Sequence, residues 1–444
     1  MANEKTATAY KPGSYELIKM ELVPADGDPL DLKLIFTDFQ ITEGIADKTM
    51  RGYITFLDSA DITNKIEFTG LEKIELEWKS TVKDDPEISF SMQVYKSQIQ
   101  IADDGTKKLV MLQLVSPEHF ISPVKSVSKA YVNSTPSEDV EAIFGETFGS
   151  LGKPIEVHPT DNSHTKIVPN LSVLEALEHF CKISYAGQFN TSLFKFYETR
   201  DGFYFHNIEK LINTNRGEAT KFKYISNVNE CPQDEAAQTT VSQIQFNNTK
   251  DMMKMLKSGL LANEVKEISL LDKSVALYPF SIKDKFPDIE HLDDQSASMH
   301  VDKFYDEYIN EDNVMPRTYS IFRNNDFNEG DPMQDTAYIS PRLTYLLSLS
   351  QMSATMGVHG NTKLKVGDCI DLDMPAATPF EGRDQEPFVS GVWCITAIKH
   401  VVDDSTYAME LTLMKDSYRD NAPEGNAHER LTVARNSDSQ TEEV

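Results

Sequence analysis

Residues 391–413, GVWCITAIKHVVDDSTYAMELTL, contain two runs in which hydrophobic side chains recur at every second position. The alternating positions are Val392, Cys394, Thr396 and Ile398 in the first run, and Tyr407, Met409, Leu411 and Leu413 in the second. A period of two puts successive side chains on opposite faces of an extended chain. Each run therefore predicts a β-strand with one face on a core, within a strand-rich region that spans residues 354–415 and also includes Ile370, Leu372 and Met374.

The same alternation occupies the other end of the chain, between residues 15 and 115. Its five sets are Ile18, Met20 and Leu22; Leu32, Leu34 and Phe36; Ile74, Leu76 and Trp78; Ile88, Phe90, Met92 and Val94; and Val110, Leu112 and Leu114. Turn-forming residues at 24–29, 84–86 and 103–105 separate these sets. Short strands punctuated in this way are typical of an antiparallel sandwich or barrel.

Residues 120–210 have a different pattern, which predicts a small α+β unit. Thr135 precedes Pro136 and Glu138 in the order of a capping box, and Ser172 precedes Glu175 in the same way, so a helix is expected after each. Farther on, two aromatic runs flank Arg200-Asp201-Gly202. Because an Asp-Gly pair tolerates positive φ, this stretch predicts a β-hairpin.

The region from residue 211 to residue 352 gives weaker signals. We expect a strand near 241–246, a helix over 252–261, a strand within 265–278, a helix over 299–309 and another helix over 340–352. Residues 376–387 combine prolines, a glycine and charges, so they predict a loop.

The composition narrows the function classes. The 444 residues carry 70 acidic and 43 basic side chains, a formal net charge of −27. This charge argues against wrapping nucleic acid and against docking on an anionic membrane, because both need exposed Lys and Arg. The four cysteines are widely spaced and predict buried thiols rather than a disulfide scaffold. The polar N-terminal stretch predicts no secretory signal.

Several residues resemble functional motifs, but each has a simpler structural interpretation. His158 and His164 lie near Asp161 without the spacing of a metal site, and Glu118-His119 and Glu290-His291 lack the partner of a zinc motif. Other such residues are the DxxDxD carboxylates Asp368, Asp371 and Asp373, the helix-end glycines Gly145, Gly149 and Gly152, and the aromatic residues from Phe194 to Phe205. We expect solvated carboxylates, a helix stop and a sheet core, respectively. The sequence predicts no catalytic residue, no bound cofactor and no metal site.

Four stretches, taken together, resemble the baseplate hub proteins of contractile-tailed bacteriophages of the T-even type. In chain order they are Pro169-Asn170-Leu171 before its helix; Tyr197–Phe203 (YETRDGF) with Ile208–Leu211 after it; Gly360-Asn361-Thr362 with Val366-Gly367-Asp368; and Ser390-Gly391 with Val392–Ile395, Ile398-Lys399-His400 and Lys415-Asp416-Ser417. Their order and spacing extend the similarity from about residue 15 to residue 418.

The resemblance implies a mainly β chain with α+β insertions and two tail-tube-like antiparallel β-barrels. The implied domains are 1–119, part of the first barrel; 120–212, the α+β insertion; 213–335, the remainder of the first barrel and the second barrel region; 336–418, a C-terminal β domain; and 419–444, a flexible acidic tail. Three such chains would form a pseudo-hexameric ring.

The resemblance also implies a structural, non-enzymatic role in the virion, for a chain made in the host cytoplasm. The homotrimer would adapt the hexameric tail tube to the trimeric central spike and line the DNA channel. Its partners would be the tube or tube-initiator protein, the spike, the tape-measure protein and baseplate wedge components. DNA would pass an acidic wall without specific binding. No membrane insertion is expected, because no run approaches 18 apolar residues.

Three alternatives stay open. The chain could be the equivalent hub of a tailocin or another contractile injection system, which has the same mechanics. It could be a tail-tip peptidoglycan hydrolase with Glu198 or Asp201 as acid and base, although Glu198 beside a turn is more simply a surface residue. A carbohydrate-binding module would need exposed Trp clusters, and the chain has only Trp78 and Trp393.

Overall fold

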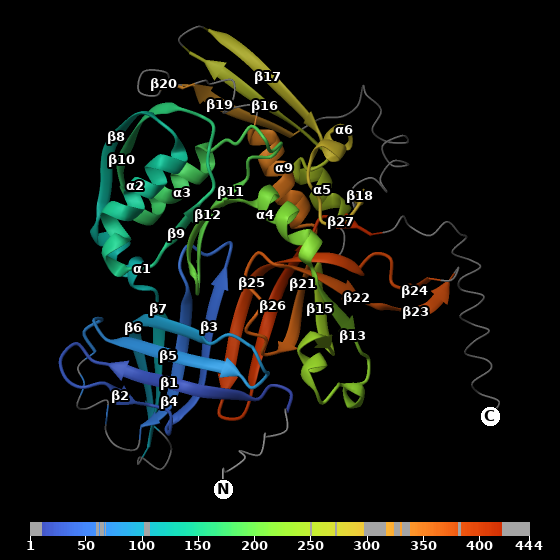
Figure 1. The fold of residues 1–444 in the computed structure, drawn as a ribbon. Coiled ribbons are helices and arrows are strands. Elements are labelled where there is room, and N and C mark those ends of the chain that lie inside the picture. Colours follow the sequence, from blue (N-terminus) through green and yellow to red (C-terminus); the bar gives the residue numbers. More distant parts are fainter. Residues whose placement is uncertain are drawn as a thin grey trace.

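A computed structural model describes residues 11–58, 62, 66, 68–101, 107–248, 251–270, 273–296, 317–323, 329–330, 338–380 and 383–419. The described residues are mainly β, and their helices lie between residues 117 and 349 of the sequence (Figure 1). This confirms the mainly β fold class predicted from the alternating patterns. The strand predicted on Leu32, Leu34 and Phe36 is wrong, because residues 33–35 form a turn in which Leu34 is 97 % exposed. The predicted helix over 299–309 and, apart from Arg419, the predicted tail lie outside the described residues.

The largest element is a 14-stranded sheet whose strands come from both ends of the chain. Its first part, the N-terminal sheet, contains β1 (Tyr15–Val23), β2 (Leu30–Asp31), β3 (Phe36–Gly44), β4 (Arg51–Asp58), β5 (Lys73–Ser80), β6 (Ile88–Ile101) and β7 (Lys108–Val115). Its second part, the C-terminal sheet, contains β13 (Thr220–Tyr224), β14 (Thr240–Val241), β15 (Gln243–Asn248), β21 (Met352–His359), β22 (Cys369–Asp373), β25 (Gly391–Asp403) and β26 (Tyr407–Lys415).

Strand β25 joins the two sheets. Its first residues, 391–394, pair with β22 of the C-terminal sheet, and residues 397–403 pair with β3 of the N-terminal sheet along the same edge. Strand β26 occupies the other edge of β25. The two sheets lie side by side in Figure 1, where the blue strands meet the orange ones. One strand thus serves two sheets, so neither can form completely without it.

The N-terminal sheet rolls around a core of aromatic side chains. Trp78 of β5 is fully buried, and its ring centroid lies 5.0 Å from that of Phe39 on β3 and 5.9 Å from that of Tyr407 on β26. The Tyr407 backbone N–H donates to the Gly13 carbonyl oxygen at 2.8 Å, which brings the lead-in of β1 to β26. Among the described residues the ladder nevertheless stays open, and β13 pairs in parallel with β14 and β22. Each part is therefore an open sheet and not the closed antiparallel barrel that the resemblance implied.

A β-bulge in β25 changes the side-chain pattern predicted for residues 392–398. The register against β26 shifts between Ile395 and Ala397. Val392 and Thr396, which we expected on the core side, are half-buried, and Trp393 and Ile395 are buried in their place. Cys394 and Ile398 are buried as predicted. An extra residue in one strand reverses the facing of everything that follows it, and sequence alternation alone does not show where this happens.

The α+β insertion lies above the N-terminal sheet in Figure 1, as the prediction for residues 120–210 implied. It contains α1 (Pro117–Val124), β8 (Ser126–Ser134), α2 (Pro136–Phe148), β9 (Ile155–Val157), β10 (His164–Ser172), α3 (Val173–Ile183), β11 (Phe194–Thr199), β12 (Gly202–Asn207) and α4 (Ile208–Asn215). Both capping boxes are present, at Thr135 and Ser172, and the predicted hairpin is β11–β12. Its own core holds α2 and α3 on the hairpin's aromatic face.

The remaining elements lie around the C-terminal sheet and the insertion (Figure 1). They are α5 (Met252–Ser258), β16 (Ala262–Ser269), β17 (Ser274–Ser281), α6 (Ile282–Lys285), β18 (Gln295–Ser296), β19 (Arg317–Arg323), β20 (Glu329–Gly330), α9 (Ile339–Leu349), β23 (Pro375–Phe380), β24 (Arg383–Gln385) and β27 (Ser417–Tyr418), with short 3-10 turns that include η6 (Phe286–Asp288). Of these, β16, β17 and β19 form a sheet at the top of Figure 1, β20 pairs with β10 of the insertion, and β23 and β24 project to the right. The loop predicted for 376–387 is wrong, because β23 and β24 pair there in an antiparallel hairpin.

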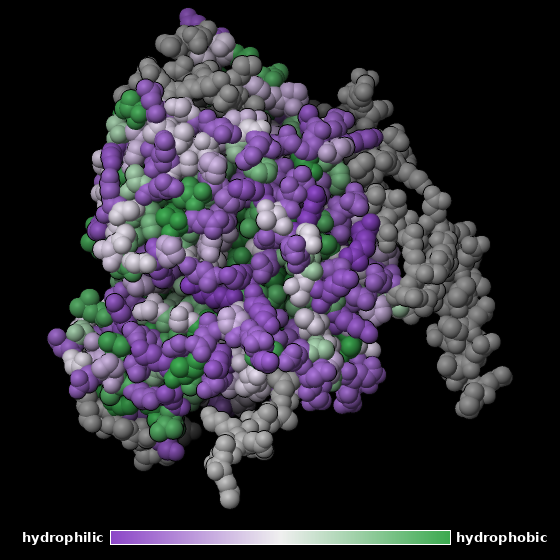
Figure 2. Space-filling view, viewed as in Figure 1, coloured by the Kyte–Doolittle hydropathy of each residue, from purple (hydrophilic) through white to green (hydrophobic). Residues whose placement is uncertain are grey.

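Hydrophilic side chains cover most of the face shown in Figure 2, and hydrophobic side chains form small scattered groups on it. In the part of the chain that the structure describes, each helix is too short or too polar to cross a lipid bilayer.

Candidate functional site

The motif residues converge where the insertion meets the two sheets. The first meeting point, the hairpin junction, consists of Glu43, Glu198, Arg200, Thr362 and His400 with their direct partners. Arg200 lies in the turn between β11 and β12, and its guanidinium Nη2 donates to the Thr362 and Leu364 carbonyl oxygens at 2.8 and 2.9 Å. Its backbone N–H donates to Glu43 Oε2 at 2.9 Å. The hairpin tip is therefore fixed to both sheets at once.

Glu198 is buried in this junction, so its interpretation as a surface residue is wrong. It is 1 % exposed, and its Oε2 accepts the Met50 backbone N–H at 2.9 Å while Oε1 contacts Lys153 Nζ. Glu118 is equally buried, and its Oε2 lies 3.9 Å from the same ammonium group. Burial raises the pKa of Glu118. Because the insertion and the β3–β4 loop cover both carboxyl groups, they act as ties between these parts.

Behind the hairpin tip, Glu43, His400 and Tyr407 form a buried chain of hydrogen bonds. His400 Nε2 lies 3.1 Å from Glu43 Oε1, and His400 Nδ1 lies 2.8 Å from the Tyr407 hydroxyl. Burial raises the pKa of Tyr407, so its hydroxyl stays protonated. Because Nε2 faces a carboxylate, which only accepts, the geometry places a ring proton on Nε2 and leaves Nδ1 to accept from the hydroxyl. Nε2 then donates to the carboxylate. This chain links β3, β25 and β26, the strands at the seam between the two sheets.

The first position of the Gly-Asn-Thr motif, Gly360, requires a glycine. A Cβ at this position would overlap the ring of Tyr407. The Gly360 carbonyl oxygen accepts the Gln238 side-chain amide at 2.8 Å, and its N–H donates to the Tyr407 carbonyl at 3.0 Å. Only a residue without a side chain lets this loop approach β26 closely enough to present the Thr362 carbonyl to Arg200.

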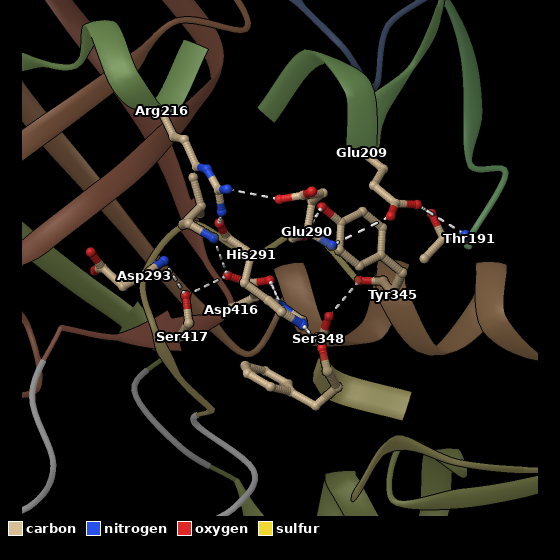
Figure 3. A network of polar contacts seen from close by, with 12 residues as sticks. Thr191, Glu209, Arg216, Glu290, His291, Asp293, Tyr345, Ser348, Asp416 and Ser417 are labelled. Atoms are coloured by element: carbon tan, nitrogen blue, oxygen red, sulfur yellow. Dashed lines mark hydrogen bonds and ion pairs between the residues drawn. The ribbon is translucent and has the colours of Figure 1, made fainter. Parts of the chain in front are cut away.

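The second meeting point, the C-terminal junction, surrounds Lys415-Asp416-Ser417, and Figure 3 shows Asp416 and Ser417 with their partners. His291 Nδ1 lies 2.6 Å from Asp416 Oδ2, and His291 Nε2 lies 3.0 Å from the Phe286 carbonyl oxygen. Both ring nitrogens therefore face oxygen atoms that can accept a hydrogen bond. Burial opposes ionisation of Asp416, but the charge and hydrogen bond of His291 outweigh it and hold the pKa of this carboxyl below its usual value.

Lys415 forms a buried ion pair beside it. Its side chain is fully buried, and Nζ lies 2.6 Å from Asp293 Oδ2 and 2.8 Å from the Ser390 carbonyl oxygen. Burial lowers the pKa of Lys415, against the attraction of Asp293. A Cβ on Gly391 would overlap the Asp293 carboxylate and lie 2.5 Å from Lys415 Nζ, and Gly391 has a φ of +115°. The Ser-Gly motif thus makes room for the ion pair.

The same network extends into the insertion (Figure 3). Glu209 Oε2 accepts the backbone N–H and the hydroxyl of Thr191 at 2.9 and 2.6 Å. Arg216 donates to the His291 carbonyl oxygen at 2.7 Å and pairs with the Glu290 carboxylate at 2.8 Å. Tyr345 of α9 donates to the Glu290 carbonyl oxygen at 3.0 Å. Residues 289–293 are therefore held between the insertion, α9 and the end of β26.

The histidines of the sequence analysis do not meet as a group. His164 lies 3.1 Å from Asp139, and Asp161 accepts the Gly187 backbone N–H at 2.6 Å. His158 instead stacks on His206, with centroids 3.9 Å apart and Glu156 beside them. No local pattern in the sequence indicates this cluster, because only the parallel pairing of β9 with β12 creates it.

This histidine cluster is a poor metal site. The Asn207 backbone N–H donates to His158 Nδ1 at 3.1 Å. The neutral ring therefore carries its proton on Nε2, the nitrogen that faces Glu156, and a protonated nitrogen is not a ligand. Burial lowers the pKa of His158 to about 3 and that of His206 to about 4, so both rings are neutral at pH 7.

The other singled-out residues have structural surroundings. Asp371 and Asp373 are half-buried on the face of β22 opposite its core residues, and Asp371 contacts Arg419. Asp201 is exposed and pairs with Lys365 at 2.8 Å. The two tryptophans, Trp78 and Trp393, are at most 1 % exposed, which is unlike the exposed clusters of a carbohydrate-binding module.

Comparisons with known proteins show which solved structures share the fold of this chain. No family model matches the chain, and no curated protein matches its sequence. Among solved structures it is similar to a tail protein from Neisseria meningitidis MC58, with a TM-score of 0.51 and 10 % identity over 91 % of this chain and 97 % of that one. It is also similar to the 43 kDa tail protein of prophage MuSo2 from Shewanella oneidensis, with a TM-score of 0.52 and 9 % identity over 91 % and 100 %.

The chain has the fold of these tail proteins. The resemblance predicted from four short motifs is therefore confirmed at that level, over nearly the whole length of both structures.

Proposed function

We propose that this chain is a structural subunit of a contractile-tail baseplate hub. The observation that supports this proposal best is the presence of two rolled sheets in one chain, joined through β25. Three copies would present six such sheets, which matches a hexameric tube on one side and a trimeric spike on the other. The tail-protein fold of the two similar structures points in the same direction.

The two junctions suit this role, because a ring needs subunits of fixed shape. The hairpin junction ties the insertion to both sheets through Arg200. The C-terminal junction ties the insertion, α9 and β26 through buried charges. Buried, hydrogen-bonded side chains of this kind hold parts in one arrangement. Of the two carboxylates considered for a hydrolase, Glu198 is inaccessible, and the exposed Asp201 is paired with Lys365.

The contact between copies is proposed to use the far half of β6. Strand β5 pairs with β6 only up to Gln93, and β7 covers the other edge. Beyond that point, within the described residues, the free edge carries the exposed side chains Ile99 and Ile101, 50 % and 64 % exposed. An unpaired edge with apolar side chains is a ready template for a neighbouring chain.

The finer parts of the proposal follow from the hub role. The proposal includes the domain boundaries given above and a location in the virion tail. It also includes a DNA channel lined by acidic side chains and contacts with tube, spike, tape-measure and wedge proteins. A net charge of −27 supports passage of DNA without adhesion. A tailocin hub would do the same work without DNA, so the presence of packaged DNA in the particle distinguishes the two.

Light scattering after gel filtration tests the proposal. A hub gives a mass of three times the 50.1 kDa chain, alone or after co-expression with its spike protein. The substitution Ile99→Lys should reduce the trimer to monomers, whereas Leu277→Lys, at an equally exposed position on β17, should not. A chain that stays monomeric with the spike present, or that clears a peptidoglycan suspension, contradicts the proposal.

A further inference from the structure

Two of the four cysteines face one another across paired strands. Cys369 begins β22, Cys394 lies in β25, and the antiparallel register places these two residues directly opposite each other. Each is 2 % exposed. Because directly opposite residues project from the same face of a sheet, the two thiols share one buried position.

The backbone hydrogen bonds determine the spacing of this pair. The Ile395 N–H donates to the Asp368 carbonyl oxygen at 2.9 Å, so the hydrogen-bonded pair is Asp368–Ile395, the neighbour of the cysteine pair. Hydrogen-bonded and non-hydrogen-bonded pairs alternate along antiparallel strands. Cys369 and Cys394 are thus a non-hydrogen-bonded pair, whose Cα atoms lie about 4.5 Å apart in antiparallel sheets. A disulfide spans Cα separations of about 4.4–6.8 Å. Bond formation therefore needs little backbone movement.

The side chains agree with the register. The pKa of the Cys394 thiol is raised, first by its hydrogen bond with the Cys369 thiol and then by burial. The other two cysteines have different neighbours. Cys181 is buried in the core of the insertion, and Cys231 Sγ lies 4.0 Å from His359 Nε2.

We propose that Cys369 and Cys394 form an oxidisable dithiol that closes to a cross-strand disulfide. The oxidant is the disulfide of a low-molecular-weight thiol such as glutathione. One cysteine thiolate attacks it, forms a mixed disulfide and releases one glutathione thiol. The second cysteine then attacks the mixed disulfide and releases the other. Two protein thiols are oxidised, one glutathione disulfide is reduced, and the two cysteine protons end on the released thiols.

Burial makes this reaction slow in the closed sheet, because the reactive species is the thiolate and it needs access to the oxidant. Oxidation therefore proceeds through local opening of β22, a short strand. Once formed, the bond fastens β22 to β25 beside the residues of β25 that pair with β3. It closes the segment between residues 369 and 394, so the oxidised chain is expected to resist unfolding more strongly.

Mass spectrometry of the full chain tests this proposal. The reduced protein is incubated in a glutathione redox buffer, with and without a concentration of urea below the unfolding transition. We expect a mass lower by about 2 Da, a cross-linked peptide containing Cys369 and Cys394, and a fall from four to two titratable thiols after denaturation. The urea midpoint should rise on oxidation and return to its starting value with reductant.

Four single variants provide the controls. Cys369→Ser and Cys394→Ser should abolish the mass change, and Cys181→Ser and Cys231→Ser should leave it intact. If a variant does not fold, peptide mapping of the unsubstituted chain still decides the matter. The proposal is overturned if all four thiols survive conditions in which amide exchange shows β22 opening, or if cross-links to Cys181 or Cys231 are equally frequent.

Discussion

Breaking the ion pair of the C-terminal junction should have unequal effects from its two sides. The side chain of Lys415 is completely buried, whereas that of Asp293 is 8 % exposed. The substitution Asp293→Asn leaves a buried ammonium group whose remaining partner is the Ser390 carbonyl oxygen. We expect it to lower the free energy of unfolding by about 3–5 kcal/mol, the usual cost of an unpaired buried charge.

Lys415→Met should cost less. The Asp293 carboxylate keeps the Val392 N–H at 3.0 Å and some contact with water, so we expect a loss of about 1–3 kcal/mol. Burial already lowers the pKa of Lys415, which means that desolvation outweighs the attraction of its partner. The double variant, with both charges removed, should therefore regain most of the stability that Asp293→Asn loses.

Urea unfolding of the two single variants and the double variant, followed by intrinsic fluorescence, measures these differences at pH 7. The coupling energy of the cycle should be at least about 1 kcal/mol in the direction of rescue. A double variant whose loss equals the sum of the single losses would refute the reasoning. So would a Lys415→Met variant that is less stable than Asp293→Asn.

Three further predictions concern the insertion and its junction. Arg200→Lys keeps the charge but not the planar guanidinium, whose Nη2 donates to two carbonyl oxygens, so urea unfolding should show a loss of about 1–3 kcal/mol, and a loss below about 0.5 kcal/mol contradicts the assignment. The folded chain holds the pKa of His158 at about 3 and that of His206 at about 4, below the ordinary 6.5, so it binds fewer protons than the unfolded chain. The urea midpoint should therefore decrease as the pH is lowered from 6.5 to 4, and it should decrease less in His206→Gln. Equal decreases in the two proteins would contradict the role of His206. Gly360→Ala should cost about 1–3 kcal/mol because of the Tyr407 ring, whereas Gly145→Ala, with open space in α2, should add about 0.5–1 kcal/mol in thermal unfolding, and similar effects of the two contradict the steric argument.

Local signals in the sequence predicted most of the elements. Alternation identified β1, β5, β6 and β7 of the N-terminal sheet and β22, β25 and β26 of the C-terminal sheet, but no alternating set covered β4 or β13. The capping residues Thr135 and Ser172 placed two helices correctly. These signals are carried by residues close together in the chain, so they need no knowledge of the tertiary structure. The bulge in β25 and the β23–β24 hairpin were missed, because packing against distant strands produces them.

The junctions show what local patterns omit. Glu198 sits beside a turn, where a carboxylate is usually solvated, but Met50 and Lys153 bury it from positions far along the chain. The motif residues Arg200 and Asp416 were identified by order and spacing alone. Their partners, Thr362 and His291, come from segments more than 100 residues away, so the chemistry of each contact was visible only in the fold.

The sharing of β25 has a consequence for how the chain is made. Strand β3 ends at Gly44, but the strand that pairs with its free edge ends only at Asp403. At about 5–20 residues per second, a ribosome needs roughly 20–70 s to add the intervening chain. During that time β3 can pair with β4 on one edge only, and the backbone groups of its other edge have no partner strand. A product truncated before β25 would keep this unpaired edge, which is a template for aggregation.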